Sequence, residues 1–490
     1  MPSPAILFAL GWFAGAALLP ASDPAWPAIE RLCSAGLTGE PCPETRPLPR
    51  ARIVEMVRHA RDAGELNAAT AAALVQLERE FATDLAPVDV TSAGAHVRAA
   101  NPRPPLHDLG TGARLGEDRG NEGFVPTHAA ARAHLHAVAA TGPAAAGLTV
   151  AATLHDASDL THNEPAPVSR VAGIARVTIP EATLSATLAG LTLTAGRTAI
   201  SWGGGTRGNL LFTDATGGLD LVDLSLTRPW HGLAFRANAI RLEDRRGHPL
   251  IFAQRLSWSP TAFATVSAQR GILCCENTAH VSLADAPAIL LATHENTPGD
   301  RLDFDQIATV SASASLPRAW SAALHGLGAR AFYEYGGTDL YGLDDVKRHG
   351  NFPHLLVASN EFGAFVAAGP VTATAEYARI GKPRVDWYAN DRYPEGWSWE
   401  GLGTGHPAGG RGESTLLAAT LSLAQGREIG ARFLSEDFNR GTAARTHRRR
   451  AGLTASTPLP RNTTLRLQIE RVEQPGYRGL EGQASLTIER

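Results

Sequence analysis

The sequence predicts a mainly β protein: a large antiparallel transmembrane β-barrel of about 16–18 strands with a small N-terminal α-helical bundle. From about residue 88 onward, apolar and polar residues alternate with period 2, whereas the preceding segment repeats with the helical period of 3.6. The alternating segments approach the length of a tilted membrane strand. Some connections between them are tight and others are long, which is the pattern of an outer-membrane barrel.

The N-terminal part is predicted to hold two units. Residues 1–22 contain an apolar run that is too short for a spanning helix and ends in small residues, so they are interpreted as a signal peptide. Residues 23–84 are predicted to form a periplasmic helical bundle. Trp26, Ile29 and Leu32 recur at helical spacing, and two further apolar stripes follow. Helices this short need one another and a larger body to pack against.

The four cysteines form two close pairs in the sequence. Export into an oxidising compartment would allow Cys33 and Cys42 to close a small loop. Cys274 and Cys275 are adjacent, and neighbouring strand residues face opposite sides. They are therefore expected to be two separate packed thiols, and no histidine lies at ligand spacing to suggest a metal site.

Residues 85–490 are predicted to form the barrel. Clusters of Gly, Pro, Asn and Asp separate the alternating segments, and Pro180 is taken as one such break. A soluble propeller or β-helix would need a fixed repeat of 20 to 50 residues, which the sequence does not contain. The clearest alternation occurs over 148–155, 170–179, 183–188, 233–242, 307–316, 364–378, 416–423, 428–434 and 465–472.

The charge balance argues against nucleic acid as a partner. The chain carries 45 Lys and Arg against 48 Asp and Glu, a formal net charge of −3. No global field therefore favours a polyanion. The local run Arg448, Arg449 and Arg450 is interpreted as a solvated turn or rim.

A glycine motif stands between two alternating segments over 191–226. Its members are Trp202, Gly203, Gly204 and Gly205. Three successive glycines in a β region predict a bend or a place where another backbone comes close. The motif lacks the Lys-Ser/Thr ending and the following helix of a phosphate-binding loop, so nucleotide binding is not expected.

An aromatic-rich loop over 386–400 holds three of the nine tryptophans. Exposed aromatic rings between carboxylates, amides and arginine would suit a carbohydrate, because sugar C–H faces stack on rings while the hydroxyls take the polar groups. The alternative is a compact loop or plug packed by its own aromatics. The candidate polysaccharide contacts are Trp387, Tyr388, Arg392, Tyr393, Trp397 and Trp399.

Catalytic motifs are missing from the sequence. His349, His354 and His406 lie near carboxylates, but neither a Gly-x-Ser-x-Gly elbow nor a His-Glu-x-x-His motif occurs. We therefore expect no catalytic residue, no metal site and no cofactor. An outer-membrane enzyme acting on glycans stays open as an alternative, since it would need a carboxylate pair that sequence cannot place.

Several stretches together resemble the Wzi-type capsule assembly family of outer-membrane proteins. The helical opening from Ile29 is similar to that of the family, and Gly196-Arg197 followed by the glycine motif is similar to its most recognisable motif. The resemblance spans most of the mature chain. The other stretches that carry it are 46–50, 121–123, 208–211, 249–260, 332–335, 338–339, 405–407 and 413–414.

The resemblance implies a lectin-like barrel in the cell outer membrane, with the helical bundle on the periplasmic side, that attaches or organises capsular polysaccharide without covalent chemistry. The expected partners are capsular or exopolysaccharide, outer-membrane lipid and the polysaccharide export machinery. A porin-like channel remains the alternative, because a barrel of this size can hold an aqueous lumen.

Overall fold

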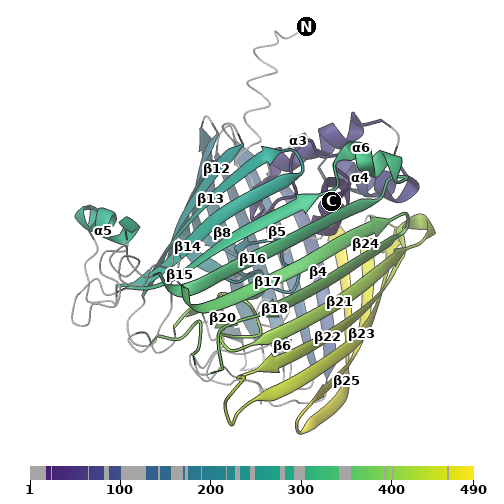
Figure 1. Ribbon diagram of the computed structural model, residues 1–490. Helices are drawn as coiled ribbons and strands as arrows, with labels where there is room; N and C mark the ends of the chain where they lie inside the picture. The colour runs from purple at the N-terminus through teal and green to yellow at the C-terminus, as the bar shows by residue number, and fades with distance from the viewer. Residues whose placement is uncertain are drawn as a thin grey trace.

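The computed structural model shows a single large barrel with all but one of the described helices at one end (Figure 1). It describes residues 18–21, 23, 25–64, 66–81, 88–100, 129–141, 144–155, 169–171, 175–188, 190–216, 218–226, 232–242, 249–275, 282–291, 304–340, 355–383, 385–390, 393, 396–399, 402–460 and 463–489.

The barrel strands are β4 (Val88–Ala100), β5 (Ala129–Thr141), β6 (Ala144–His155), β8 (Ala175–Leu188), β9 (Leu191–Thr198), β11 (Leu219–Leu226), β12 (Leu233–Arg241), β13 (Leu250–Thr261), β14 (Ala264–Cys274), β15 (Asp305–Ser315), β16 (Gly328–Leu340), β17 (Leu355–Ala368), β18 (Val371–Arg379), β21 (Glu413–Ser422), β22 (Glu428–Phe438), β23 (Thr446–Leu459), β24 (Thr463–Gln474) and β25 (Tyr477–Glu489).

The shorter elements lie in the connections and at the N-terminus. The helices are α2 (Trp26–Ser34), α3 (Arg50–Arg61), α4 (Ala68–Glu80), α5 (Ala286–Leu291) and α6 (Arg318–Ala323), with single 3-10 turns η2 (Asp214–Thr216), η3 (Leu283–Asp285) and η4 (Ala424–Gly426). The short strands are β1 (Leu18–Leu19), β2 (Thr45–Arg46), β3 (Leu48–Pro49), β7 (Ser169–Val171), β10 (Ser201–Trp202), β19 (Ser398–Trp399) and β20 (Leu402–Gly403).

The barrel closes on itself through antiparallel pairs. Successive strands pair around the ring, β25 pairs with β4, and β9 pairs with β11 across the glycine motif, with Leu191 opposite Leu226 and Thr198 opposite Leu219. Within the described part of the chain this ring has eighteen strands, and β7 pairs only with β8. Closure leaves the ring without a free edge. The predicted fold class and strand number are therefore confirmed.

The break expected at Pro180 is not present. Strand β8 continues through this residue, and the pairing with β6 shifts there, from Thr149 opposite Glu181 to Ala151 opposite Thr178. Two residues of β8 thus oppose one of β6, which is a β-bulge. A bulge leaves the proline, which has no N–H to donate, outside the regular ladder. The prediction of two separate strands here was wrong.

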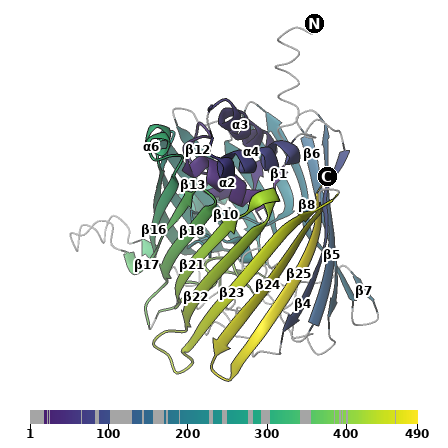
Figure 2. The same cartoon turned by 90° about the vertical axis from the view of Figure 1, so that its right-hand side faces the viewer.

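The two ends of the barrel differ in their connections. Tight turns such as 369–370, between β17 and β18, lie at the end that carries α2, α3, α4 and α6 (Figures 1 and 2). The opposite end carries the long connections, among them 199–218 between β9 and β11, and 380–412 between β18 and β21. The asymmetry predicted from the sequence is thus present, and we refer to the short-turn end and the long-loop end.

The N-terminal helices form a small core of their own at the short-turn end. Trp26, Ile29 and Leu32 of α2 are buried with residues of α3 and α4. A disulfide joins Cys33 to Cys42, as the sequence allowed. None of the helices in the described ranges is long and apolar enough to cross a membrane.

Polar contacts fasten this helical bundle to the barrel. Arg31 Nη1 donates to Gly369 O at 2.9 Å, in the turn after β17. Asn67 Nδ2 donates to Gly326 O at 3.0 Å, in the connection before β16. The same Asn67 caps α4, because its Oδ1 accepts the Thr70 N–H at 2.9 Å. The expected signal segment is described only at 18–21, where β1 pairs with β3.

The adjacent cysteines are joined to each other, so the prediction of two separate thiols was wrong. Cys274 is the last residue of β14, and Cys275 already lies outside the strand with φ +68°. The alternation rule fails here because it holds only within a strand. Their Cα atoms are 3.7 Å apart, and both residues are buried in a small cluster with Ile272 and Phe304.

The outer wall of the barrel is apolar and exposed. Leu184 and Leu188 of β8 are 68% and 76% exposed, although both are leucines in the middle or at the end of a long strand. The same holds for outward positions on most other strands, among them Leu193, Val222, Leu256, Val310, Phe362, Leu417, Leu453, Ile469 and Leu480. A contiguous apolar surface of this kind is uncommon on a soluble protein and typical of a wall that faces lipid.

Candidate functional site

Described residues of three segments pack against the inner wall of the barrel. We call them together the plug: 44–49, 200–216 with the glycine motif, and the described residues of 380–412 with the aromatic loop. The first two pair with each other, since β2 and β10 form a small antiparallel sheet and Gly203 N donates to Glu44 O at 2.8 Å. The plug therefore joins parts of the chain that are far apart in sequence.

The glycine motif is a tight bend inside the barrel. Trp202 is fully buried and packs edge-on against Phe212, with ring centroids 5.1 Å apart. A Cβ atom on Gly205 would lie 1.8 Å from Gly208 O, and one on Gly204 would lie 2.7 Å from the Phe332 ring. The close backbone approach predicted from the glycines is confirmed, because no larger side chain fits at these positions.

Asn209 fixes the shape of this bend. Its Oδ1 accepts the Gly205 N–H at 2.9 Å, and its Nδ2 donates to Ser201 Oγ at 2.8 Å and to Phe212 O at 3.3 Å. One fully buried amide thus holds the loop closed on both sides. Asn209 belongs to the stretch 208–211 that carries the family resemblance, but its role in the bend was not predicted, although an asparagine next to glycine is typical of side chains that bond to a turn backbone.

The aromatic loop is packed inside the barrel. Trp387, Tyr388, Tyr393 and Trp397 are at most 3% exposed and belong to the same buried cluster as the glycine motif. Trp397 Nε1 donates to Asp305 at 2.8 Å. The expected exposure of these rings was therefore wrong, and the alternative of a plug packed by its own aromatics describes them.

Two of the candidate sugar contacts, Arg392 and Trp399, have side chains outside the described residues. Arg392 lies outside the described residues, as do His349 and His354. The backbone of Trp399 belongs to β19, which pairs with β20, but its side chain is outside the described part of the chain. Polysaccharide contact by this loop stays a prediction.

Tyr388 links the two larger plug segments. Its hydroxyl donates to Leu210 O at 2.6 Å and accepts the His406 N–H at 2.8 Å. Burial holds the pKa of this phenol well above its usual range. The hydroxyl therefore stays protonated, which the bond to Leu210 requires.

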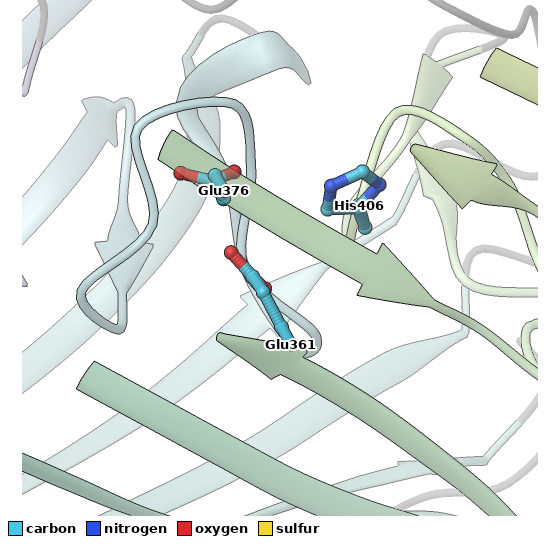
Figure 3. A group of neighbouring side chains, drawn as sticks. All are labelled: Glu361, Glu376 and His406. Atoms are coloured by element: carbon cyan, nitrogen blue, oxygen red, sulfur yellow. The ribbon is translucent and has the colours of Figure 1, made fainter. Parts of the chain in front are cut away.

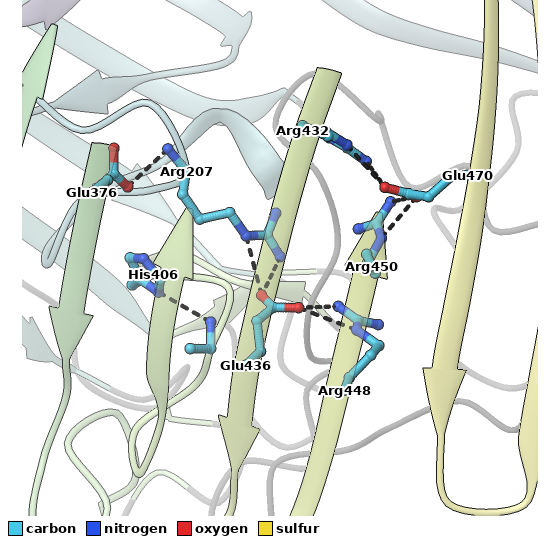
Figure 4. Close-up of polar contacts among 9 residues, drawn as sticks. Arg207, Glu376, His406, Arg432, Glu436, Arg448, Arg450 and Glu470 are labelled. Atoms are coloured by element: carbon cyan, nitrogen blue, oxygen red, sulfur yellow. Dashed lines mark hydrogen bonds and ion pairs between the residues drawn. The ribbon is translucent and has the colours of Figure 1, made fainter. Parts of the chain in front are cut away.

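A chain of buried ion pairs fastens the plug to the inner wall (Figure 4). Arg207 of the plug reaches Glu436 on β22 at 2.7 Å, and Arg448 on β23 reaches the other oxygen of the same carboxylate at 2.6 Å. The side chains of all three residues are at most 4% exposed. The Thr206 and Arg207 N–H groups donate to Glu376 on β18, at 2.6 and 2.9 Å.

The arginine run is not a solvated rim. Alternation along β23 turns Arg448 and Arg450 inward, where each is 2% exposed, and leaves Arg449 on the outer side. Arg450 pairs with Glu470 of β24, which Arg432 also reaches at 2.8 Å (Figure 4). The prediction was wrong for the two inward arginines because their carboxylate partners lie on other strands.

Glu361, Glu376 and His406 form a buried cluster (Figure 3), which lies beside the glycine bend. One ligand-type atom from each lies within 4.8 Å of the others. His406 Nδ1, however, accepts the Ala408 N–H at 3.1 Å. Because a backbone N–H can only donate, the neutral ring then carries its proton on Nε2. In this tautomer Nε2 carries a proton and not the lone pair with which a histidine ligates a metal ion.

These features define a class of protein: a closed antiparallel barrel with an apolar outer wall and a packed plug that contacts its polar inner wall. The solved structure of Wzi from Escherichia coli, described as an outer-membrane protein involved in group 1 capsule assembly and a carbohydrate-binding β-barrel, is similar to this chain. The two share 13% identity, with 97% of this chain and 99% of Wzi covered and a TM-score of 0.71.

Two other solved structures are similar over a smaller part of the chain. OccAB4 from Acinetobacter baumannii has 11% identity and a TM-score of 0.48, and OccK8 (OprE) from Pseudomonas aeruginosa has 7% and 0.49; each comparison covers 82% of this chain and 98% of the other. No family model and no curated protein sequence matches the chain. The resemblance inferred from sequence motifs is confirmed at the level of the fold.

Proposed function

We propose that this chain is an outer-membrane β-barrel that binds capsular or exopolysaccharide at the cell surface and organises it without covalent chemistry. The observation that carries the proposal is the likeness in fold, over 97% of the chain, to a barrel described as carbohydrate-binding and involved in capsule assembly. The exposed apolar wall supports a place in a membrane.

We infer the orientation of the barrel from the connections at its two ends. Barrels of the outer membrane have short turns on the periplasmic side and longer loops outside. The helical bundle, which is fastened to the short-turn end through Arg31 and Asn67, would then face the periplasm, where the export machinery could meet it. The polysaccharide would meet the long-loop end.

A host-cell experiment tests the function directly. Deleting the protein in an encapsulated host should lower the amount of surface-attached polymer and raise the amount released into the medium. Unchanged attachment would contradict the proposal. Incubating purified protein with the polymer should leave its chain length unchanged, whereas new reducing ends would support an enzyme instead.

Trp399 is the position at which to test sugar contact. Trp399→Ala should weaken retention of the purified protein on immobilised polysaccharide, and Trp258→Ala serves as the matched control, because Trp258 is a half-exposed tryptophan of the outer wall. Trp387 and Trp397 are unsuitable, since both are buried and their loss would disturb the plug. Equal retention by the two variants would exclude Trp399 as a contact.

The channel alternative is opposed by the plug. Side chains of the plug and of the inner wall share one buried apolar cluster, which includes Trp202, Leu210 and Trp397 beside Ile251 and Ile307. In planar bilayers we expect no large, steady current from the purified protein. Such a current would support a porin-like function and contradict this expectation.

A further inference from the structure

Four arginines gather on the outer surface of the barrel at the long-loop end. We call them the rim arginine patch: Arg445 in the hairpin between β22 and β23, Arg449 on β23, Arg471 on β24 and Arg478 on β25. Arg449 is exposed, and the side chains of the other three are 61%, 57% and 73% exposed. The hairpins of β22–β23 and β24–β25 lie opposite the helices (Figures 1 and 2).

Strand register places the patch in one compact area. Arg449 lies opposite Glu473, and Glu473 lies opposite Arg478 on the next strand. Arg471 is two residues before Glu473 on the same outward side and reaches it at 2.6 Å. Two guanidinium groups therefore share one carboxylate, and Arg449, whose Nε donates to His447 Nε2 at 3.0 Å, lies opposite it on the neighbouring strand.

The patch carries an excess of positive charge. Its carboxylates are Glu473, which Arg478 also reaches at 3.2 Å, and Asp437, which pairs with Arg445 at 2.7 Å. His447 lies beside Asp437 at 3.5 Å. With the histidine neutral, four arginines against two carboxylates leave two positive charges, and exposed guanidinium groups keep donors available for a further anion.

The apolar wall begins directly below the patch. The next outward positions are Ile469 after Arg471 and Leu480 after Arg478, which are 51% and 60% exposed. The remaining outward positions toward the short-turn end of these four strands are uncharged, in the ranges 428–438, 446–459, 463–474 and 477–488. Within these four strands the outward charges therefore lie at the long-loop end, where they meet the apolar surface.

We propose that the rim arginine patch binds the phosphate groups of phosphorylated lipid headgroups in the outer leaflet of the membrane. The inference rests on the proposed outer-membrane location. If the apolar band lies in the hydrocarbon layer, the arginines lie at the depth of the headgroups, where each basic side chain adds to the attraction of anionic lipid. Guanidinium groups bind phosphate oxygens in pairs.

The test compares two double variants of the full chain in a neutral detergent, with lipid A as the probe and native mass spectrometry as the readout. Arg471→Gln/Arg478→Gln removes two charges from the patch. Arg427→Gln/Arg466→Gln removes two exposed charges near the short-turn end, in the turn before β22 and on the inward side of β24. Migration of unheated and heated samples in gels shows that each variant folds.

The patch variant should bind lipid A about 25-fold more weakly, at about fivefold for each guanidinium removed, and the control variant should bind as the wild type does. Equal binding by the two variants would overturn the proposal. Inorganic phosphate at matched phosphate concentration should compete poorly, and full displacement by it would mean a free-phosphate site instead.

A separate measurement distinguishes this inference from the proposed location. Wild-type protein that inserts into phosphatidylcholine vesicles but binds lipid A no better than the patch variant would leave the membrane location standing and overturn the inference. Protein that does not insert at all would overturn both.

Discussion

The inner and outer faces of the same strands differ in which side chains are buried and which are exposed. On β9, Thr192 and Thr194 face inward and are each 1% exposed, while Leu191 and Leu193 face outward and are 45% and 48% exposed. A protein in water would be expected to show the reverse. The inward hydroxyls are covered by other parts of the same chain, whereas the outward leucines have no cover within it and match a lipid surface.

The inner and outer faces of the strands therefore have different partners. The inner wall is completed by the plug, through hydrogen bonds and ion pairs that need one specific geometry. The outer wall needs only an apolar medium, because contacts with hydrocarbon have no preferred direction. Adjacent residues on one strand should therefore respond very differently to substitution.

The largest expected effect is at Glu436, inside the barrel. Glu436→Gln leaves Arg207 and Arg448 without their shared carboxylate in a buried site. Removing one partner of a buried pair typically costs about 3–5 kcal/mol, so the free energy of unfolding should fall by about that amount. Urea unfolding of the refolded barrel, followed by tryptophan fluorescence, would measure it, and a change below about 1 kcal/mol would show that the ion pairs do not hold the plug.

A charge placed on the outer wall should destabilise the barrel slightly less than Glu436→Gln does. Leu453 lies near the middle of β23 and is 58% exposed. Leu453→Arg should destabilise the barrel in bilayers by about 2–4 kcal/mol if this position lies near the midplane, with Leu453→Ile as a control of similar volume. In a water-facing position the same change would cost about 0.5 kcal/mol or less, so unchanged folding into vesicles would contradict a lipid-facing wall.

The glycine bend should be the next most sensitive position. A Cβ atom at Gly205 would meet Gly208 O and the Glu361 carboxylate at 1.8 and 2.1 Å. Gly205→Ala should therefore destabilise the fold by about 1–3 kcal/mol and loosen the plug, which protease sensitivity of the 200–218 segment would report. Gly482→Ala is the control, because nothing lies within 4 Å of a Cβ there. Equal stability of the two variants would mean that the bend can shift without cost.

The smallest expected effect is at Asp437, the next residue after Glu436 but on the outer face. Its partner Arg445 has a side chain that is 61% exposed. Exposed pairs contribute about 0–1 kcal/mol, so Asp437→Asn should change the free energy of unfolding by no more than that. A loss as large as that of Glu436→Gln would remove the contrast between the two faces.

Much of the fold could be predicted because its signals are local. Period-2 alternation predicts strands, and turn residues predict their ends, without knowledge of what each strand pairs with. The glycine bend could also be predicted from a local signal, since the steric freedom of glycine is a property of the residue itself. Pro180 shows the limit, because the bulge that accommodates it depends on the pairing of β8 with β6.

The errors at the candidate site have a common cause. Arg448 and Arg450 look solvated in sequence because their partners Glu436 and Glu470 are on other strands. Trp387 and Trp397 look available for a sugar because nothing local reveals that their loop turns back into the barrel. The link between Cys274 and Cys275 depends on β14 ending between them.

By itself, the sequence determined the architecture: a helical start, a long series of alternating strands and a bend at three glycines. Only the tertiary structure decided which face of each strand is covered by the chain and that four aromatic side chains of the loop are buried inside the barrel. The physical reason is that strand periodicity depends on neighbouring residues, whereas burial of a charge or a ring depends on groups that closure of the barrel brings from hundreds of residues away, as it does for Arg207 and Glu436.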